Sequence, residues 1–184
     1  MEATKNHLEH QWELLDLRDF PIPFYNESGS VAMMEPEQYT DPAATKWATK
    51  IGEMDGFLVV AQEYNHGYTA VLKNALDYAF KQWHSKPMSF VSYGGAAGGA
   101  RAVEQLRGVA IELQLIPLRN QVVIPLYWSA FNQERQPNDE GHNTSLQGVL
   151  TELSSWTTKL KTIRNTKSTL SSYVTGRVLC QEHT

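Results

Sequence analysis

A short apolar run followed by a helical pattern constrains the fold of this chain more than any other feature. The run, Phe57 to Ala61, lies between Gly56 and a polar turn, Gln62 to Gly67, which is typical of a strand buried on both faces of a parallel sheet. From Thr69 the apolar residues return at the spacing of one helix face: Val71, Leu72, Ala75, Leu76, Ala79 and Phe80. Ligands bind at the carboxyl ends of such strands, so we expect function at Glu63 to Tyr68.

The rest of the chain repeats this alternation of strands and helices. Arg18 to Asp41 is predicted to be loop, and Asp41-Pro42 reads as the cap and first residue of a helix. Further strands are expected at Trp12–Leu17, Met88–Tyr93 and Leu118–Leu126, and helices at 42–54, from Thr69 to before Lys86, after Gly99 and at 144–163. This order predicts a parallel α/β fold in one domain, residues 1–164, with a loosely ordered tail at 165–184.

Composition and charge narrow the classes of function. The chain has 184 residues and a net charge of -4 with acids and bases interspersed, which argues against nucleic acid as a partner. Cys180 is the only cysteine, so a reducing, cytoplasmic location is expected. Met1 to His10 has no signal-peptide core, and no apolar run approaches the ~20 residues that span a bilayer. We therefore expect no membrane partner.

A glycine-rich segment, Gly94 to Gly99, lies between an expected strand and an expected helix. Glycines at this position let a flat or anionic ligand approach backbone amides. They also serve tight turns and close helix packing, and spacing alone leaves the two readings equal. The segment is not a P-loop, since no Gly-Lys-Ser/Thr ends it.

The neighbouring loop, Glu63 to Gly67, offers an aromatic ring, an amide and a glycine. Two such loops side by side suit a planar heterocycle, with backbone amides for its polar edge and tyrosines for its face. The alternative is a polar turn in which Asn65 caps the next helix. Both readings stay open at this point.

Other chemistries find little support in the sequence. The six histidines show no metal-ligand spacing apart from His7 and His10, so we expect no metal site. No nucleophilic triad is evident, and no dedicated catalytic residue is assigned. Three aromatic residues near the end of the central helix are interpreted as core or subunit interface: Tyr78, Phe80 and Trp83.

At these two loops the sequence resembles the NADPH-dependent FMN reductase family, which is flavodoxin-like in fold. The likeness covers roughly residues 11–164 and rests on Glu63–Tyr68 with Leu72–Asp77, Ser92–Gly95 with Gly98–Ala102, Lys86-Pro87, Leu106-Arg107 and Leu15–Phe20 with its prolines. The resemblance implies a three-layer sheet with helices on both faces. It also implies FMN as cofactor and NADPH as hydride donor, with ring contacts at Glu63, Tyr64, Asn65, Gly67, Tyr93, Gly94, Gly95 and Gly98.

The chain departs from the family at its beginning. Family members open with a buried strand and a Gly-Ser-x-Arg loop that binds the FMN phosphate, whereas this sequence resembles an N-terminally truncated form. A smaller departure is Gln62, which stands where the family usually has proline before the acidic residue of the loop. Losing three charge-assisted hydrogen bonds would weaken FMN binding by on the order of a thousandfold. Without the first strand, the remaining strands should follow one another in one direction across the sheet. Right-handed crossovers should then leave only the last helix on the second face. We expect the fold to be less stable than that of a full-length relative.

The sequence thus predicts an NAD(P)H-dependent FMN oxidoreductase that passes electrons to a flavin, quinone or similar small acceptor. The resemblance also implies a homodimer or homotetramer, partly through the helix corresponding to Thr69–Trp83. The alternative is a catalytically silent truncated variant that keeps the fold as an oligomerisation or partner-binding scaffold.

Overall fold

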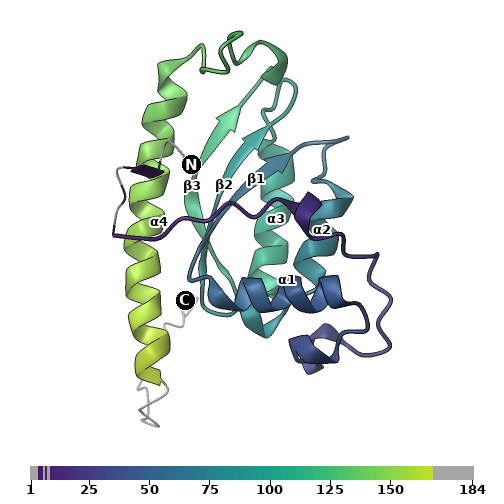
Figure 1. The fold of residues 1–184 in the computed structure, drawn as a ribbon. Coiled ribbons are helices and arrows are strands. Elements are labelled where there is room, and N and C mark those ends of the chain that lie inside the picture. Colours follow the sequence, from purple (N-terminus) through teal and green to yellow (C-terminus); the bar gives the residue numbers. More distant parts are fainter. Residues whose placement is uncertain (1–3, 6, 8, 168–184) are drawn as a thin grey trace, which may run out of the picture.

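The computed structural model describes residues 4, 5, 7 and 9–167. Within them, three strands form one parallel sheet in the order β1-β2-β3 (Figure 1). The elements follow one another as α1 (Pro42–Glu53), β1 (Phe57–Gln62), α2 (Ala70–Asp77), β2 (Pro87–Tyr93), α3 (Ala100–Glu112), β3 (Ile116–Ile124) and α4 (Glu140–Lys167). The predicted parallel α/β fold is confirmed, and the strands step in one direction as expected.

Helices cover both faces of the sheet, so the fold has three layers (Figure 1). Alternate strand residues such as Met88 and Phe90 pack against α1, α2 and α3 in the larger core. Their neighbours face α4, where Val122 meets Val149 in a smaller core. The last helix is therefore alone on the second face among the described elements, as the crossover argument predicted.

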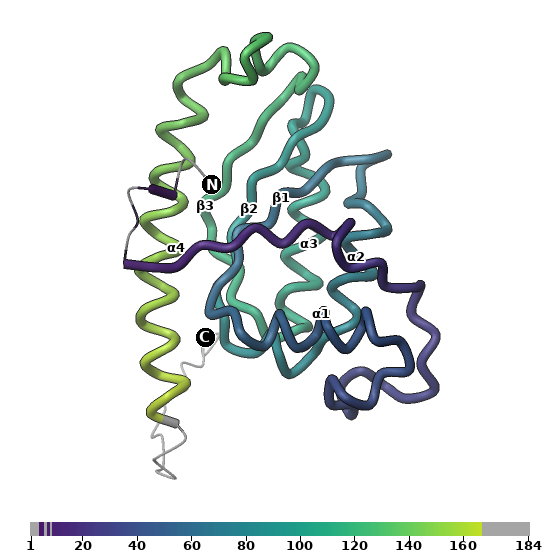
Figure 2. Tube along the Cα trace, viewed as in Figure 1, coloured from purple at the N-terminus to yellow at the C-terminus, as the bar shows by residue number. Residues whose placement is uncertain are grey.

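The predicted first strand, Trp12–Leu17, is wrong. This segment is irregular and crosses the direction of the strands on its way from α4 to α2, where Leu17–Asp19 form a short 3-10 turn (Figures 1 and 2). Leu15 and Leu17 pack against the larger core, while Leu14 is exposed. The apolar residues are thus buried by helices, and the segment has no neighbouring strand with which to form a ladder.

The expectation that β1 is buried on both faces is also wrong. Val60, at the centre of the strand, is 62% exposed, whereas Ala61 is fully buried. Helix α4 packs over β2 and β3, and β1 is the edge strand next to them. One face of β1 therefore stays open towards its carboxyl end.

The helix ends show which local signals were sufficient. Asp41 caps α1 as predicted, its Oδ1 accepting the Ala43 amide at 2.7 Å. The central helix is shorter than predicted, since α2 ends at Asp77 and Trp83 lies in a separate 3-10 turn. The Trp83 indole donates to the Leu76 carbonyl at 3.1 Å, which turns the chain back under α2 and buries the ring. Tyr78 is likewise fully buried, so both belong to the core.

The last helix extends beyond its predicted limits of 144–163. It begins at Glu140 and runs for 28 residues to Lys167, so residues 165–167 of the expected tail are helical. The remainder of that predicted tail, 168–184, lies outside the described residues. Within the described part of the chain, the helices are too short or too polar to cross a membrane.

Candidate functional site

The loop after β1 is a tight turn with an unusual backbone. Tyr64 and Gly67 exchange backbone hydrogen bonds of 2.9 Å each, and the residues between them, Asn65 and His66, have φ of 50° and 71°. Positive φ at both central positions defines a type I′ turn, which favours Asn-Gly over Asn-His. Helix α2 is capped by Thr69, whose hydroxyl accepts the Leu72 amide. The capping alternative for Asn65 is therefore wrong.

A side chain of α3 holds the strained turn in place. Gln105 of α3 donates its side-chain amide to the His66 carbonyl at 2.9 Å. The backbone amides of Asn65 and His66 have no hydrogen-bond partner among the residues that the structure describes. A left-handed histidine costs about 1 kcal/mol, and such strain is found at ligand sites. The turn thus presents donors to its surroundings at an energetic cost.

The glycines after β2 have two different roles: some allow close packing within the protein, and one leaves the backbone open to a ligand. A Cβ on Gly98 would lie 2.5 Å from Val123, and one on Gly99 would lie 2.7 Å from Ser92; both have positive φ. The packing explanation therefore holds for these two. A Cβ on Gly95 would meet nothing within 4 Å, so this residue faces open space. The ligand-access explanation rests on Gly95.

The glycine loop is fixed to the segment after β3. The Gly95 carbonyl accepts the Leu126 amide at 3.0 Å, and the Gly94 carbonyl accepts the Tyr127 amide at 3.2 Å. Leu126 has φ of 48°, a left-handed conformation that directs the chain across the end of the sheet. The Tyr127 ring then meets the Tyr93 ring edge to face, with centroids 5.8 Å apart.

An apolar groove of about 290 Å³ lies where these segments meet. It opens on the α4 face of the sheet, at the carboxyl ends of the strands. Apolar and aromatic side chains line it: Val60, Val91, Tyr93, Ile124, Tyr127 and Phe131. Pockets for whole cofactors span roughly 300–1,000 Å³, so the groove suits a planar ring system more than an entire nucleotide.

Glu63 occupies the opposite side of this edge. Its carboxylate accepts hydrogen bonds from the Arg101 Nε at 2.7 Å and from the Arg101 backbone amide at 3.2 Å. The hydrogen bond from Arg101 comes first among the causes that hold the pKa of Glu63 below its usual range. Only 4% of the Glu63 side chain is exposed, and its carboxylate is directed to α3.

The structure brings most of the predicted ring contacts to one edge of the sheet, on the two loops after β1 and β2. Tyr93 lines the groove, and Gly94 and Gly95 follow it directly in the chain. Tyr64 and Asn65 lie exposed on the turn. Glu63 and Gly98 are engaged with the protein itself. The prediction missed five of the six lining residues: Val60, Val91, Ile124, Tyr127 and Phe131. The aromatic residues directly after β3 were the available signal for Tyr127 and Phe131.

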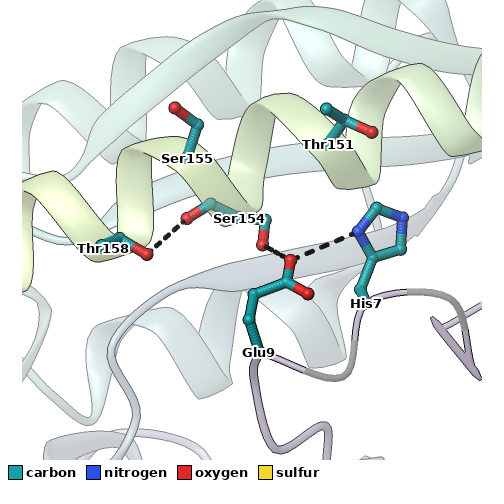
Figure 3. Close-up of a pocket in the computed structure, with 6 residues that line it drawn as sticks. All are labelled: His7, Glu9, Thr151, Ser154, Ser155 and Thr158. Carbon is teal, nitrogen blue, oxygen red and sulfur yellow. Dashed lines mark hydrogen bonds and ion pairs between the residues drawn. The ribbon is translucent and has the colours of Figure 1, made fainter.

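A second, polar pocket of about 250 Å³ lies between the N-terminal segment and α4 (Figure 3). Ser154 donates its hydroxyl to Glu9, and the Glu9 carboxylate lies 3.6 Å from His7 Nδ1. In a nucleophilic triad the histidine lies between serine and carboxylate. Here the carboxylate lies between them, so the cluster does not activate Ser154. We interpret it as the contact that attaches the N-terminal segment to α4.

Comparison with known proteins decides the family. The sequence profile described as NADPH-dependent FMN reductase matches residues 1–129. The chain belongs to this family. An NAD(P)H-dependent FMN reductase of Schizosaccharomyces pombe is 37% identical over 126 residues, which is 67% of this chain and 62% of that protein. An NAD(P)H:quinone oxidoreductase of Solanum tuberosum is 32% identical over 150 residues, covering 77% of this chain and 73% of the relative.

Structural comparison supports the same fold. The flavoenzyme FerB, an NAD(P)H:(acceptor) oxidoreductase of Paracoccus denitrificans, aligns with a TM-score of 0.67 at 21% identity, covering 86% of this chain and 85% of FerB. The flavodoxin-like architecture predicted from the sequence is thus confirmed. The chain spans less than two thirds of the length of the S. pombe reductase.

Proposed function

We propose that this chain is an NAD(P)H-dependent flavin oxidoreductase that holds the FMN ring at the apolar groove at the carboxyl ends of its strands. The observation that carries the proposal is the open approach at Gly95 beside an aromatic-lined groove. Membership of the NADPH-dependent FMN reductase family supports the cofactor and the reductant. The strained turn at Asn65 supports a ligand on the same edge.

The residues at this edge fit the ring of FMN. Tyr93 and Tyr127 would wall its apolar part and exclude water, and the amides of Asn65 and Gly95 would donate to its polar edge. When bound, the flavin accepts hydride from the nicotinamide and passes electrons to an acceptor. The protein's part is to position and shield that ring.

The acceptor is proposed to be a small, uncharged, planar molecule such as a quinone or free flavin. Relatives described as NAD(P)H:quinone oxidoreductase and 2-hydroxy-1,4-benzoquinone reductase support a quinone. The groove supports the same class, since its lining is apolar. Apolar planar molecules gain most from burial against such walls.

The assembly and location are part of this proposal. A homodimer or homotetramer would use the exposed side of α2, where Val71 is 55% exposed, because Tyr78 and Trp83 are committed to the core. A single cysteine in the sequence supports a reducing, cytoplasmic location.

The test is an FMN titration of the full chain, followed by an assay of NADPH oxidation at saturating FMN. Duroquinone is a suitable acceptor because its ring carbons are fully substituted and do not add to Cys180. We expect saturable binding and quinone-dependent NADPH oxidation. A folded protein that binds no FMN at millimolar concentration would instead support the scaffold alternative.

A further inference from the structure

A single hydrogen bond ties the centre of the turn after β1 to another part of the chain that the structure describes. The peptide group between His66 and Gly67 is used at both ends. Its N–H donates to the Tyr64 carbonyl at 2.9 Å, and its carbonyl accepts the side-chain amide of Gln105 at 2.9 Å. A Cβ built on Gly67 would lie 3.7 Å from Gln105 Oε1, so the Gln105 amide lies beside the turn as well as bonding to it.

The helix that carries Gln105 is a rigid support. Val103 and Leu106 of α3 are buried in the larger core on either side of it. Arg101, one turn earlier, is bonded to Glu63, which directly precedes the turn. Residues four positions apart lie on the same face of a helix. Arg101 and Gln105 therefore hold the start and the centre of this loop from one surface of α3.

The bond from Gln105 acts against strain in the turn. His66 has φ of 71°, a left-handed conformation that glycine adopts without penalty and histidine does not. The net contribution of one hydrogen bond to stability is of the same order as this strain. Without the Gln105 bond, the turn should therefore leave the left-handed conformation for a substantial fraction of the time. The Asn65 amide would then no longer have one fixed direction.

We propose that Gln105 is a positioning residue for the flavin site, which acts through the His66 carbonyl to select the turn conformation that presents the Asn65 amide to the ring. This inference rests on the proposed function, since it concerns the same ring. The apparent affinity of a site falls in proportion to the fraction of molecules in the competent conformation. Loss of the Gln105 amide therefore weakens flavin binding without removing any group that touches the flavin.

The first test is an FMN titration of full-length Gln105→Met, followed by quenching of flavin fluorescence. Methionine keeps the length of the side chain and the helix propensity but removes the donor. We expect the FMN dissociation constant to rise by about fivefold. At saturating FMN the rate of NADPH oxidation should match wild type, because the bound ligand restores the turn. Glu104→Met, at the adjacent exposed position of α3, is the matched control and should bind FMN like wild type.

The outcomes of this titration separate the inference from the proposed function. Normal FMN affinity in a folded Gln105→Met protein would overturn the inference and leave the proposed function standing. Binding of no FMN by folded wild type would overturn both.

A double variant distinguishes positioning from a general loss of stability. His66→Gly removes the strain that the Gln105 bond opposes. In that background, Gln105→Met should change the FMN dissociation constant by less than about twofold, because the turn no longer needs the bond. A merely structural role for Gln105 predicts the same loss of affinity whether residue 66 is histidine or glycine. Equal losses in the two backgrounds would therefore overturn the inference.

Discussion

Arg101 Nε lies 2.7 Å from Glu63 Oε1, although 38 positions of sequence separate the two residues. This contact joins the loop after β1 to the first turn of α3 and so couples the two loops of the site. Gln105 adds a second connection one turn further along α3, through the His66 carbonyl. The turn that presents Asn65 is therefore positioned by α3 as much as by its own strand.

The Glu63–Arg101 pair should make the free energy of unfolding depend on pH in the acidic range. The Arg101 hydrogen bond lowers the pKa of Glu63 in the folded state, so its stabilisation is present above the unfolded value and is lost as pH falls through the folded value. The stability difference between wild type and Glu63→Gln should therefore shrink between pH 5 and pH 3 in urea titrations. A difference that stays constant across that range, or that also appears with Glu104→Gln, would contradict this account.

A buried lysine should make the free energy of unfolding depend on pH in the alkaline range. Lys86 donates to the carbonyls of Ile51 and Gly52 at the end of α1, and burial, with Arg164 nearby, lowers its pKa to about 8. At pH values below this pKa, the folded state holds the charged lysine at a free-energy cost. The cost disappears as pH rises from the folded to the unfolded pKa, by roughly 1.4 kcal/mol per pH unit.

The measurement is the free energy of unfolding of wild type and Lys86→Met between pH 7 and pH 9.5. Wild type should gain stability relative to the variant above pH 8, because methionine keeps the apolar stem without the charge. Parallel pH profiles for the two proteins would show that Lys86 is not the group responsible.

The turn at Asn65 allows binding to be separated from folding. Asn65→Gly keeps the left-handed backbone without penalty, so the melting temperature without flavin should hold or rise. If the side chain contacts the ring, FMN affinity should fall by about threefold to tenfold. His66→Gly is the matched control in the same turn: it should stabilise the apoprotein by up to ~1 kcal/mol without the loss of affinity. Equal affinity in both variants would show that the Asn65 side chain takes no part in binding.

Exposed Val60 is expected to matter for the ligand and little for the fold. Val60→Thr keeps the shape and the β-branch while placing a hydroxyl in the groove, which should weaken FMN binding by about fivefold to tenfold. Ile111→Thr, on the exposed side of α3, is the control and should bind normally. The two variants can be compared by flavin fluorescence titration and thermal melting. Similar affinities would place the ring away from the groove.

Local signals in the sequence were sufficient wherever one residue decides the outcome. Asp41 begins α1, the run at Phe57 forms β1, and the stripe containing Val103 and Leu106 faces the core from α3. The resemblance at the two loops indicated the family correctly. In these cases periodicity and capping act within a few residues along the chain.

The errors arose where distant segments decide the outcome. Trp12–Leu17 has strand-like composition, but a strand needs a neighbouring strand, and this segment instead crosses from α4 to α2. The exposure of Val60 depends on how far α4 reaches across the sheet. The groove joins Val60, Tyr93 and Phe131 from three parts of the chain, so no local pattern contains it.

The most direct test of the central claim is amide hydrogen exchange of the full chain with and without saturating FMN, read by peptide mass spectrometry or NMR. The account predicts slower exchange confined to three segments at the carboxyl edge of the sheet: 60–67, 91–98 and 124–131. Protection at the pocket formed by His7, Glu9 and Ser154 instead, with these three segments unchanged, would contradict it.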